Sequence, residues 1–173
     1  VNYQNKLRDV TTLAHELGHG VHQVLASHNG LLVSDTPLTL AETASVFGEM
    51  LTFKFIFENL KTPQEKKMML TSKIEDMLNT VVRQISFFIF EKMIHEKRKN
   101  GELTVNDINE CWLKTQTESL GKHIHLGQNY EYFWAYIPHF IHSPFYVYAY
   151  AFGDCLVNSL YSKYEEGFKG FNE

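Results

Sequence analysis

A long stretch bracketed by helix signals constrains the fold more than any other feature. It opens on Thr62-Pro63-Gln64-Glu65, which supplies a capping hydroxyl, a proline at the first helical position and an acid in the first turn. It closes near Asn100-Gly101, after three basic residues that suit the negative end of a helix dipole. One helix over this stretch would have about 37 residues and a length of about 55 Å. The chain is therefore expected to be built around helices.

Apolar periodicity predicts four further helices, over residues 7–27, 40–60, 104–120 and 144–166. Asp9, Thr11 or Thr12 could cap the first of them. Residues 29–39 are expected to form a loop with short extended pieces around 31–34, and residues 121–142 to mix short helix with loop. We find no repeat and no linker. The expected fold is all-α, with residues 1–173 forming one unit.

Composition limits the classes of function. The chain has 173 residues, of which 44% are hydrophobic and 21% charged, as in an ordinary globular domain. A net charge of -4 gives no field that would gather nucleic acid or anionic lipid. There is no run of about 18 apolar residues, so no membrane span is expected. Cys111 and Cys155 form no disulfide framework and indicate a reducing compartment.

The chemistry is concentrated in the first predicted helix, in the stretch His15-Glu16-Leu17-Gly18-His19. Histidines at i and i+4 lie one turn apart on one helix face and can bind a single Zn²⁺. The glutamate beside the first histidine can take a proton from water at the metal. The pattern therefore predicts the active-site helix of a zincin-type peptidase, with His15 and His19 as ligands and Glu16 as general base.

A catalytic zinc of this type needs a third protein ligand. The metzincin arrangement does not fit, because His22 stands where that motif has glycine and Leu25 where it has its last histidine. A glutamate on the following helix is the alternative, and Glu42 and Glu49 lie there seven residues apart, on one face. We expect Glu42 to bind the metal and Glu49 to hold a ligating histidine by its other ring nitrogen.

Two other interpretations of these residues stay open. His22 lies three residues after His19 and could be an outer partner, an alternative ligand or a buried neutral histidine. Glu16 and His19 also match half of a di-iron helix-bundle site. The second half is missing, because Glu91 is followed by His95 four residues later rather than three.

The residues around the motif resemble those of one family, oligoendopeptidase F and its thimet-oligopeptidase relatives. The matching segments are residues 8–22, with the zinc motif; residues 41–49, similar to the helix that carries the third ligand; and residues 137–140 and 144–151, similar to the segment for substrate and transition-state contacts. They occur in the expected order over most of the chain. The resemblance implies a zinc endopeptidase that cuts short oligopeptides.

The resemblance also implies donors for the oxyanion, supplied by a tyrosine and a histidine after the long helix. Tyr150 and then Tyr148 are favoured, with His139 from the preceding segment. Tyr146 and His142 are the alternatives. On one helix the three tyrosines cannot all share a face, because they alternate in sequence. His123 and His125 are expected to be structural or surface residues.

The chain starts at Val1 and shows no leader. Relatives of this kind are several times longer and carry their zinc helix late in the chain. We therefore expect residues 1–173 to be the C-terminal part of a peptidase catalytic domain, with the missing N-terminal part as partner. A catalytically incomplete metal-binding fragment is the alternative function. The resemblance and the thiols together suggest a cytoplasmic location.

Overall fold

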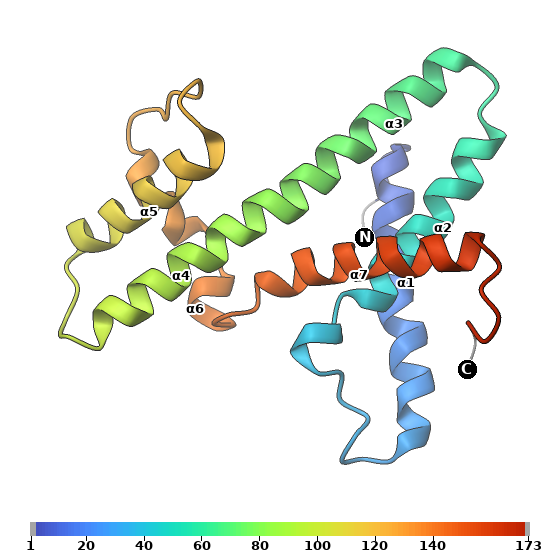
Figure 1. The fold of residues 1–173 in the computed structure, drawn as a ribbon, viewed down its shortest axis with the longest axis horizontal. Helices are drawn as coiled ribbons and strands as arrows, with labels where there is room; N and C mark the ends of the chain where they lie inside the picture. Colours follow the sequence, from blue (N-terminus) through green and yellow to red (C-terminus); the bar gives the residue numbers. More distant parts are fainter. Residues whose placement is uncertain (1–2, 172–173) are drawn as a thin grey trace. The chain divides into compact units, whose positions relative to one another are not determined.

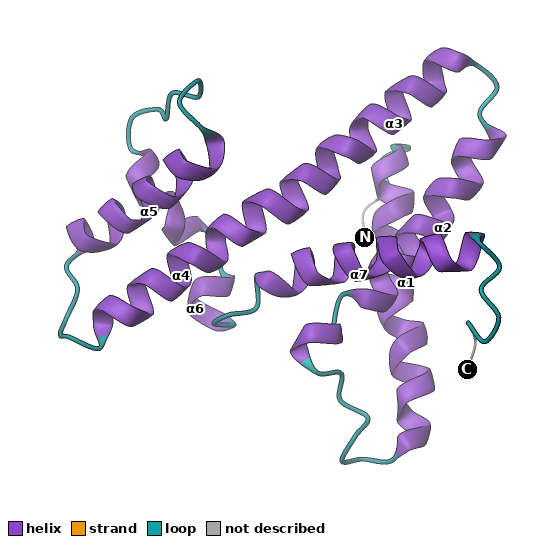
Figure 2. Ribbon diagram, in the orientation of Figure 1, coloured by secondary structure: helices purple, strands orange, loops and turns teal. Residues whose placement is uncertain are grey.

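The computed structural model describes residues 3–171. Within this range the regular elements are helices and no strand forms, which confirms the all-α fold class (Figure 2). Contacts divide the chain into two compact units. The first contains the chain up to Met77 and again from Phe152, and the second contains Leu78–Ala151. A chain expected to form one unit therefore has two centres of packing.

Helix α1 (Leu7–Ala26) begins at a cap built by one carboxylate. Asp9 accepts hydrogen bonds from two backbone N–H groups just ahead of the helix, at 2.6 and 3.1 Å. These bonds lower the pKa of the Asp9 carboxyl. The hydroxyls of Thr11 and Thr12 instead donate to a carbonyl one turn back. Of the three caps that the sequence allowed, the structure uses Asp9.

Helix α2 (Thr43–Asn59) packs directly on α1 in the first unit (Figure 1). The connection between them makes a turn over residues 30–33, in which the Val33 N–H donates to the Gly30 carbonyl. It also contains a short 3-10 helix (Leu38–Leu40). The extended pieces expected around residues 31–34 do not form. Val46 and Met50 of α2 make a small core.

Helix α3 (Pro63–Leu78) starts where the sequence predicted. The Glu65 carboxylate accepts from the N–H and the hydroxyl of Thr62, and the same hydroxyl accepts from the Glu65 N–H. The helix then passes through a π-helical segment (Asn79–Arg83) into α4 (Gln84–Arg98). One regular helix over the whole stretch was therefore wrong, because these five residues have the wider π conformation.

The second unit is held by an aromatic core. Helix α5 (Val105–Leu120) opens on a capping box formed by Thr104 and Asp107. It is followed by a 3-10 helix (Tyr130–Tyr136) and a single helical turn, α6 (His139–His142), which confirms the expected mixture of short helix and loop. The buried residues of this core are Phe87, Phe90, Cys111, Trp112 and Val147.

Helix α7 (Tyr148–Glu165) starts later than expected. The proline signal placed its beginning at Pro144, but Phe145 has a left-handed φ of 61°. A right-handed helix cannot include that conformation, so the helix begins only after it. Further along, Val157 of α7 is fully buried and joins the small core of the first unit.

Cys111 is buried, Cys155 is exposed, and both are free thiols. Among residues 3–171, no helix combines the length and apolar character needed to cross a bilayer.

Candidate metal centre

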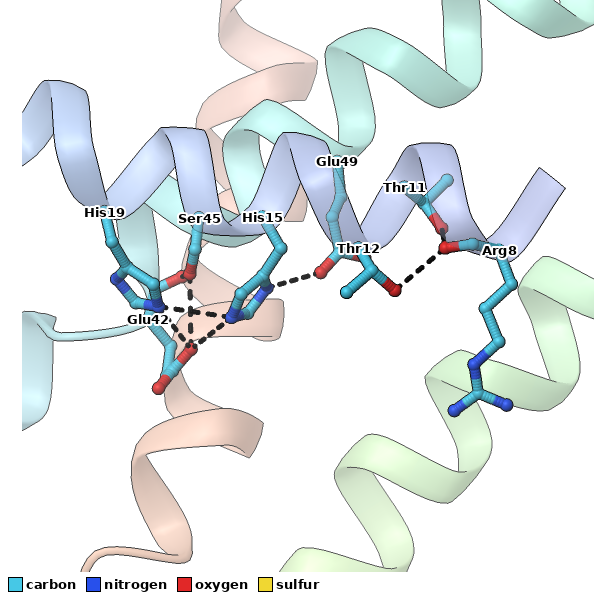
Figure 3. A network of polar contacts seen from close by, with 8 residues as sticks. All are labelled: Arg8, Thr11, Thr12, His15, His19, Glu42, Ser45 and Glu49. Atoms are coloured by element: carbon cyan, nitrogen blue, oxygen red, sulfur yellow. Dashed lines mark hydrogen bonds and ion pairs between the residues drawn. The ribbon is translucent and has the colours of Figure 1, made fainter. Parts of the chain in front are cut away.

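Two histidines of α1 point in the same direction, as their spacing requires. His15 and His19 are both half-buried. Their Nε2 atoms lie 3.2 Å apart, and the rings meet edge to face with centroids 4.8 Å apart. Figure 3 shows both imidazoles turned toward the carboxylate of Glu42. This arrangement places two nitrogen donors side by side.

Glu42 completes the group from the residue that immediately precedes α2. Its Oε2 atom lies 3.3 Å from His15 Nε2 and 3.6 Å from His19 Nε2. A tetrahedral zinc held at about 2.0–2.1 Å from each ligand keeps the ligand atoms about 3.3–3.4 Å apart. The three atoms therefore have the spacing and the chemistry that fit Zn²⁺. Within residues 3–171 they form the one group of three such side chains close enough to hold a metal.

The Glu42 side chain is fixed on two sides and is only 2% exposed. The Ser45 hydroxyl lies 3.2 Å from Glu42 Oε2 and 2.9 Å from the Glu42 carbonyl oxygen. Gly153 of α7 packs on it so closely that an added Cβ would lie 3.0 Å from Glu42 Cβ. Burial of a carboxylate is costly unless partners compensate for it, and a metal would be a strong partner.

Glu49 of α2 orients the first histidine. Its Oε1 atom lies 2.6 Å from His15 Nδ1, which leaves the Nε2 atom of the ring facing His19 and Glu42. When no metal is bound, the hydrogen bond to Glu42 and, to a smaller extent, the one to Glu49 raise the pKa of His15 to about 10. Burial acts in the opposite direction. A cation that binds here has to displace this proton. The two carboxylates thus provide the negative charge that favours a divalent ion.

Close approach of α1 and α2 brings these side chains together. A Cβ on Gly18 would lie 2.6 Å from the Ala44 carbonyl oxygen, and one on Gly48 would lie 2.9 Å from the Ala14 carbonyl oxygen. Only residues without side chains allow the backbones to pass at this distance. The ligands come from both sides of this crossing, so its geometry sets the distance between them.

The other motif residues lie apart from the three donors. Glu16 is exposed on α1, next to His15. His22 does not join the group and instead lines an apolar cavity of about 730 Å³, together with residues such as Leu17 of α1, Phe47 of α2 and Leu160 of α7. Glu91, the residue considered for a di-iron site, is in the second unit and accepts a backbone hydrogen bond from Phe145.

The predicted oxyanion donors gather in the second unit. The Tyr150 hydroxyl and His139 Nε2 form a hydrogen bond of 3.2 Å. Tyr146 stacks on the His139 ring, with centroids 5.5 Å apart, and contacts Tyr150 edge to face. Tyr148 packs instead against Phe88. Tyr146 precedes the helix, so helical periodicity could not predict that it would meet Tyr150.

His142 is exposed at the end of α6 and does not take part in this cluster. His123 and His125 are also exposed, as the sequence suggested. Sequence reasoning missed the supporting residues around Glu42 and at the helix crossing, which are Ser45, Gly18, Gly48 and Gly153. A glycine inside each of the two predicted helices, Gly18 and Gly48, was the available signal for a close crossing.

The fold and the donor group define an all-α protein with a candidate metal centre of two histidines and one glutamate on two crossing helices. The chain belongs to peptidase family M3, whose profile matches residues 1–172. Named relatives and a solved structure confirm the resemblance to oligoendopeptidase F.

Curated relatives are named as oligoendopeptidases or oligopeptidases. An oligoendopeptidase F homolog of Lactococcus lactis subsp. lactis is 32% identical over 169 residues, which is 96% of this chain and 28% of that protein. Oligopeptidase PepF of Bacillus subtilis is 30% identical over 94% of this chain and 24% of its own length. The chain thus spans about a quarter of the curated relatives it matches.

Solved structures agree with the fold. The crystal structure of oligoendopeptidase-F from Enterococcus faecium matches 95% of this chain and 30% of that chain, with a TM-score of 0.74 and 25% identity. A structure from Chlamydophila abortus matches 98% of this chain and 29% of that chain, with a TM-score of 0.77 and 31% identity.

Proposed function

We propose that this chain carries the zinc site of a metalloendopeptidase that hydrolyses short oligopeptides. One observation carries the proposal: His15, His19 and Glu42 present three ligand atoms at mutual distances of 3.2, 3.3 and 3.6 Å. Membership of family M3 and the oligopeptidase names of the relatives support the choice of substrate.

In this proposal the exposed Glu16 does the proton transfers. Zinc, when bound, would polarise the scissile carbonyl and lower the pKa of water at the site. The Glu16 carboxylate accepts the proton of the attacking water and then gives it to the leaving amine. Its position next to His15 in α1 keeps it beside the metal ligands, while its exposure leaves the carboxylate accessible.

The His139–Tyr150 pair is the proposed donor to the negative charge that develops on the carbonyl oxygen when water attacks the carbon. Their hydrogen bond keeps both groups in one place before substrate binds. Tyr146 stacks on His139 and is the second tyrosine of choice, because Tyr148 is engaged with Phe88. Tyr148 and His142, both proposed from the sequence, are less favoured by this arrangement.

Glu49→Gln is expected to weaken zinc binding by about 10–100-fold. A neutral amide at His15 Nδ1 makes the ligating Nε2 atom less basic, and so a weaker zinc ligand, than a carboxylate does. Competition with a fluorescent chelator measures the affinity. Glu58→Gln removes an exposed carboxylate from the same helix and serves as the control. Equal zinc affinities of the two variants would show that Glu49 has no part in holding His15.

The partner in this proposal is the part of the family fold that the chain does not span. The first unit exposes an apolar face on α1 and the loop after it, where Leu31 and Leu32 are 90% and 96% exposed. Val21, Val24 and Leu25 extend the same set of exposed residues on α1. Apolar surface of this kind commonly marks an interface. A cytoplasmic location belongs to the same proposal.

Metal removal tests the proposed function. The protein, expressed as its gene encodes it, is expected to hold one zinc per chain and to cleave an internally quenched oligopeptide. A chelator should abolish cleavage and added zinc should restore it. Bound zinc without turnover in the isolated 173 residues, with activity regained on supplying the remaining segment, would favour the incomplete-fragment alternative. A protein that takes up no zinc would refute both.

A further inference from the structure

The loop between α6 and α7 contains a strained residue. Phe145 has a φ of 61°, in the left-handed region. Asn5 and Asn129 also have positive φ. Asparagine adopts this conformation readily, whereas a bulky aromatic residue does so only when its surroundings force it. Something outside the loop therefore has to hold Phe145 in place.

Glu91 of α4 provides the holding contact. The Phe145 N–H donates to Glu91 Oε1 at 2.6 Å, across 54 positions of sequence. The Glu91 side chain is fully buried, and its Oε2 atom has no hydrogen-bond partner among the described residues. Burial raises the pKa of this carboxyl, and the bond from Phe145 acts in the opposite direction. Burying a carboxyl group when one of its oxygens has no hydrogen-bond partner costs folding free energy. A gain in stability therefore does not by itself explain why Glu91 stands here.

Two neighbours of Glu91 on the same helix enclose the Phe145 ring. His95 lies against it with ring centroids 4.6 Å apart, and Phe88 meets it edge to face at 6.5 Å. Phe88, Glu91 and His95 are spaced by three and four residues, so they share one face of α4. Residues of α4 therefore contact both the backbone N–H and the side chain of Phe145.

The next residue along the chain is Tyr146, which belongs to the proposed oxyanion group. Its ring stacks on His139 and contacts Tyr150. The Tyr146 N–H donates to the Ser143 carbonyl at 3.1 Å, and its own carbonyl accepts from the Ala149 N–H at 2.9 Å. The backbone conformation of Phe145 sets the direction in which the side chain of the next residue, Tyr146, points. A contact that fixes the Phe145 backbone therefore also fixes the position of the Tyr146 ring.

We propose that Glu91 is a positioning residue: its hydrogen bond to the Phe145 amide holds the loop in its left-handed conformation and so places Tyr146 against His139 and Tyr150. The inference rests on the proposed function, in which these three side chains serve the reaction. The proposal gives a role to Glu91, a fully buried acidic residue of α4 that the zinc site does not use.

Two variants of Glu91 separate a positioning role from a general loss of stability. Glu91→Gln keeps an oxygen that can accept from the Phe145 N–H, whereas Glu91→Met removes the acceptor at similar volume. Cys111→Ala perturbs the same buried core but leaves the Glu91 acceptor of the Phe145 N–H in place, and it is the matched control. All three are compared in the zinc-loaded protein as its gene encodes it, at equal folded fraction.

The kinetic readout is the cleavage of a quenched oligopeptide. Glu91→Met is expected to lower kcat by about 10–100-fold with little change in KM, because misplacement of a group that acts on the transition state costs rate rather than binding. Glu91→Gln is expected to keep most of the wild-type kcat, and Cys111→Ala to match the wild type. A loss of kcat in Cys111→Ala equal to that in Glu91→Met would overturn the proposal.

A spectroscopic readout does not depend on activity. With ¹⁵N-labelled phenylalanine, the Phe145 amide proton should resonate downfield, move upfield in Glu91→Met and stay in place in Glu91→Gln. With ¹³C-labelled histidine, the His139 ring signal should shift in Glu91→Met alone. Unchanged Phe145 and His139 signals in Glu91→Met would overturn the proposal even if the wild type cleaves peptides. If the wild type proves inactive, these shifts still test the positioning contact separately.

Discussion

Glu16→Gln is expected to lower kcat for oligopeptide cleavage by about 10²–10⁴-fold, the usual contribution of a general acid–base group. The amide is nearly the same size as the carboxylate but cannot accept the proton of the attacking water. Steady-state kinetics with a quenched peptide measure the loss, and zinc content is measured on the same samples. Because Glu16 is not among the three gathered donors, zinc content should stay at the wild-type value.

The matched control for this prediction is Glu75→Gln, which neutralises an exposed carboxylate on α3. It is expected to leave both kcat and zinc content unchanged. Unchanged cleavage in Glu16→Gln would eliminate Glu16 as the base and with it the proposed mechanism. A parallel loss of zinc would instead place Glu16 among the groups that maintain the metal site.

Gly18→Ala is expected to lower the free energy of unfolding by about 1–3 kcal/mol, as overpacking at a close contact does. The new methyl group would lie 2.6 Å from both the Ala44 carbonyl oxygen and Ser45 Cα, which are backbone atoms that cannot rotate away. The helices must therefore separate. Because His15 and His19 come from one helix and Glu42 immediately precedes the other, zinc affinity should fall together with stability. Urea denaturation and chelator competition measure the two effects.

Gly20→Ala is the control within the same helix. Nothing lies within 4 Å of a Cβ built on Gly20, so the substitution meets no obstacle. Alanine favours helix over glycine, and stability is expected to rise by up to about 1 kcal/mol with no change in zinc affinity. If both variants behaved alike, the close crossing at Gly18 would not be what sets the metal site.

Local signals in the sequence were sufficient for much of the helical framework. The Thr62–Glu65 pair starts α3 and the Thr104–Asp107 pair starts α5, because these hydrogen bonds join residues three positions apart and need no other part of the chain. The same locality puts His15 and His19 on one face of α1. Two of the three candidate ligands therefore follow from spacing alone.

Where the sequence misled, the cause lies far away along the chain. Pro144 is a valid helix-start signal, yet α7 begins at Tyr148 because Phe145 is held in a left-handed conformation by Glu91. For the same reason Tyr146, rather than Tyr148, meets Tyr150 and His139. No local pattern in residues 144–150 contains that information, since the contact that decides it comes from α4.

The sequence by itself determined that the chain is helical, where most helices start, and that one of them carries two histidines and a glutamate suited to zinc chemistry. These properties depend on hydrogen bonds and periodicity within a few residues. Only the tertiary structure decided that Glu42 meets both histidines within 3.6 Å and that Glu49 contacts His15. The physical reason is the close crossing at Gly18 and Gly48, where the absence of side chains lets two backbones approach and so brings distant ligand atoms together.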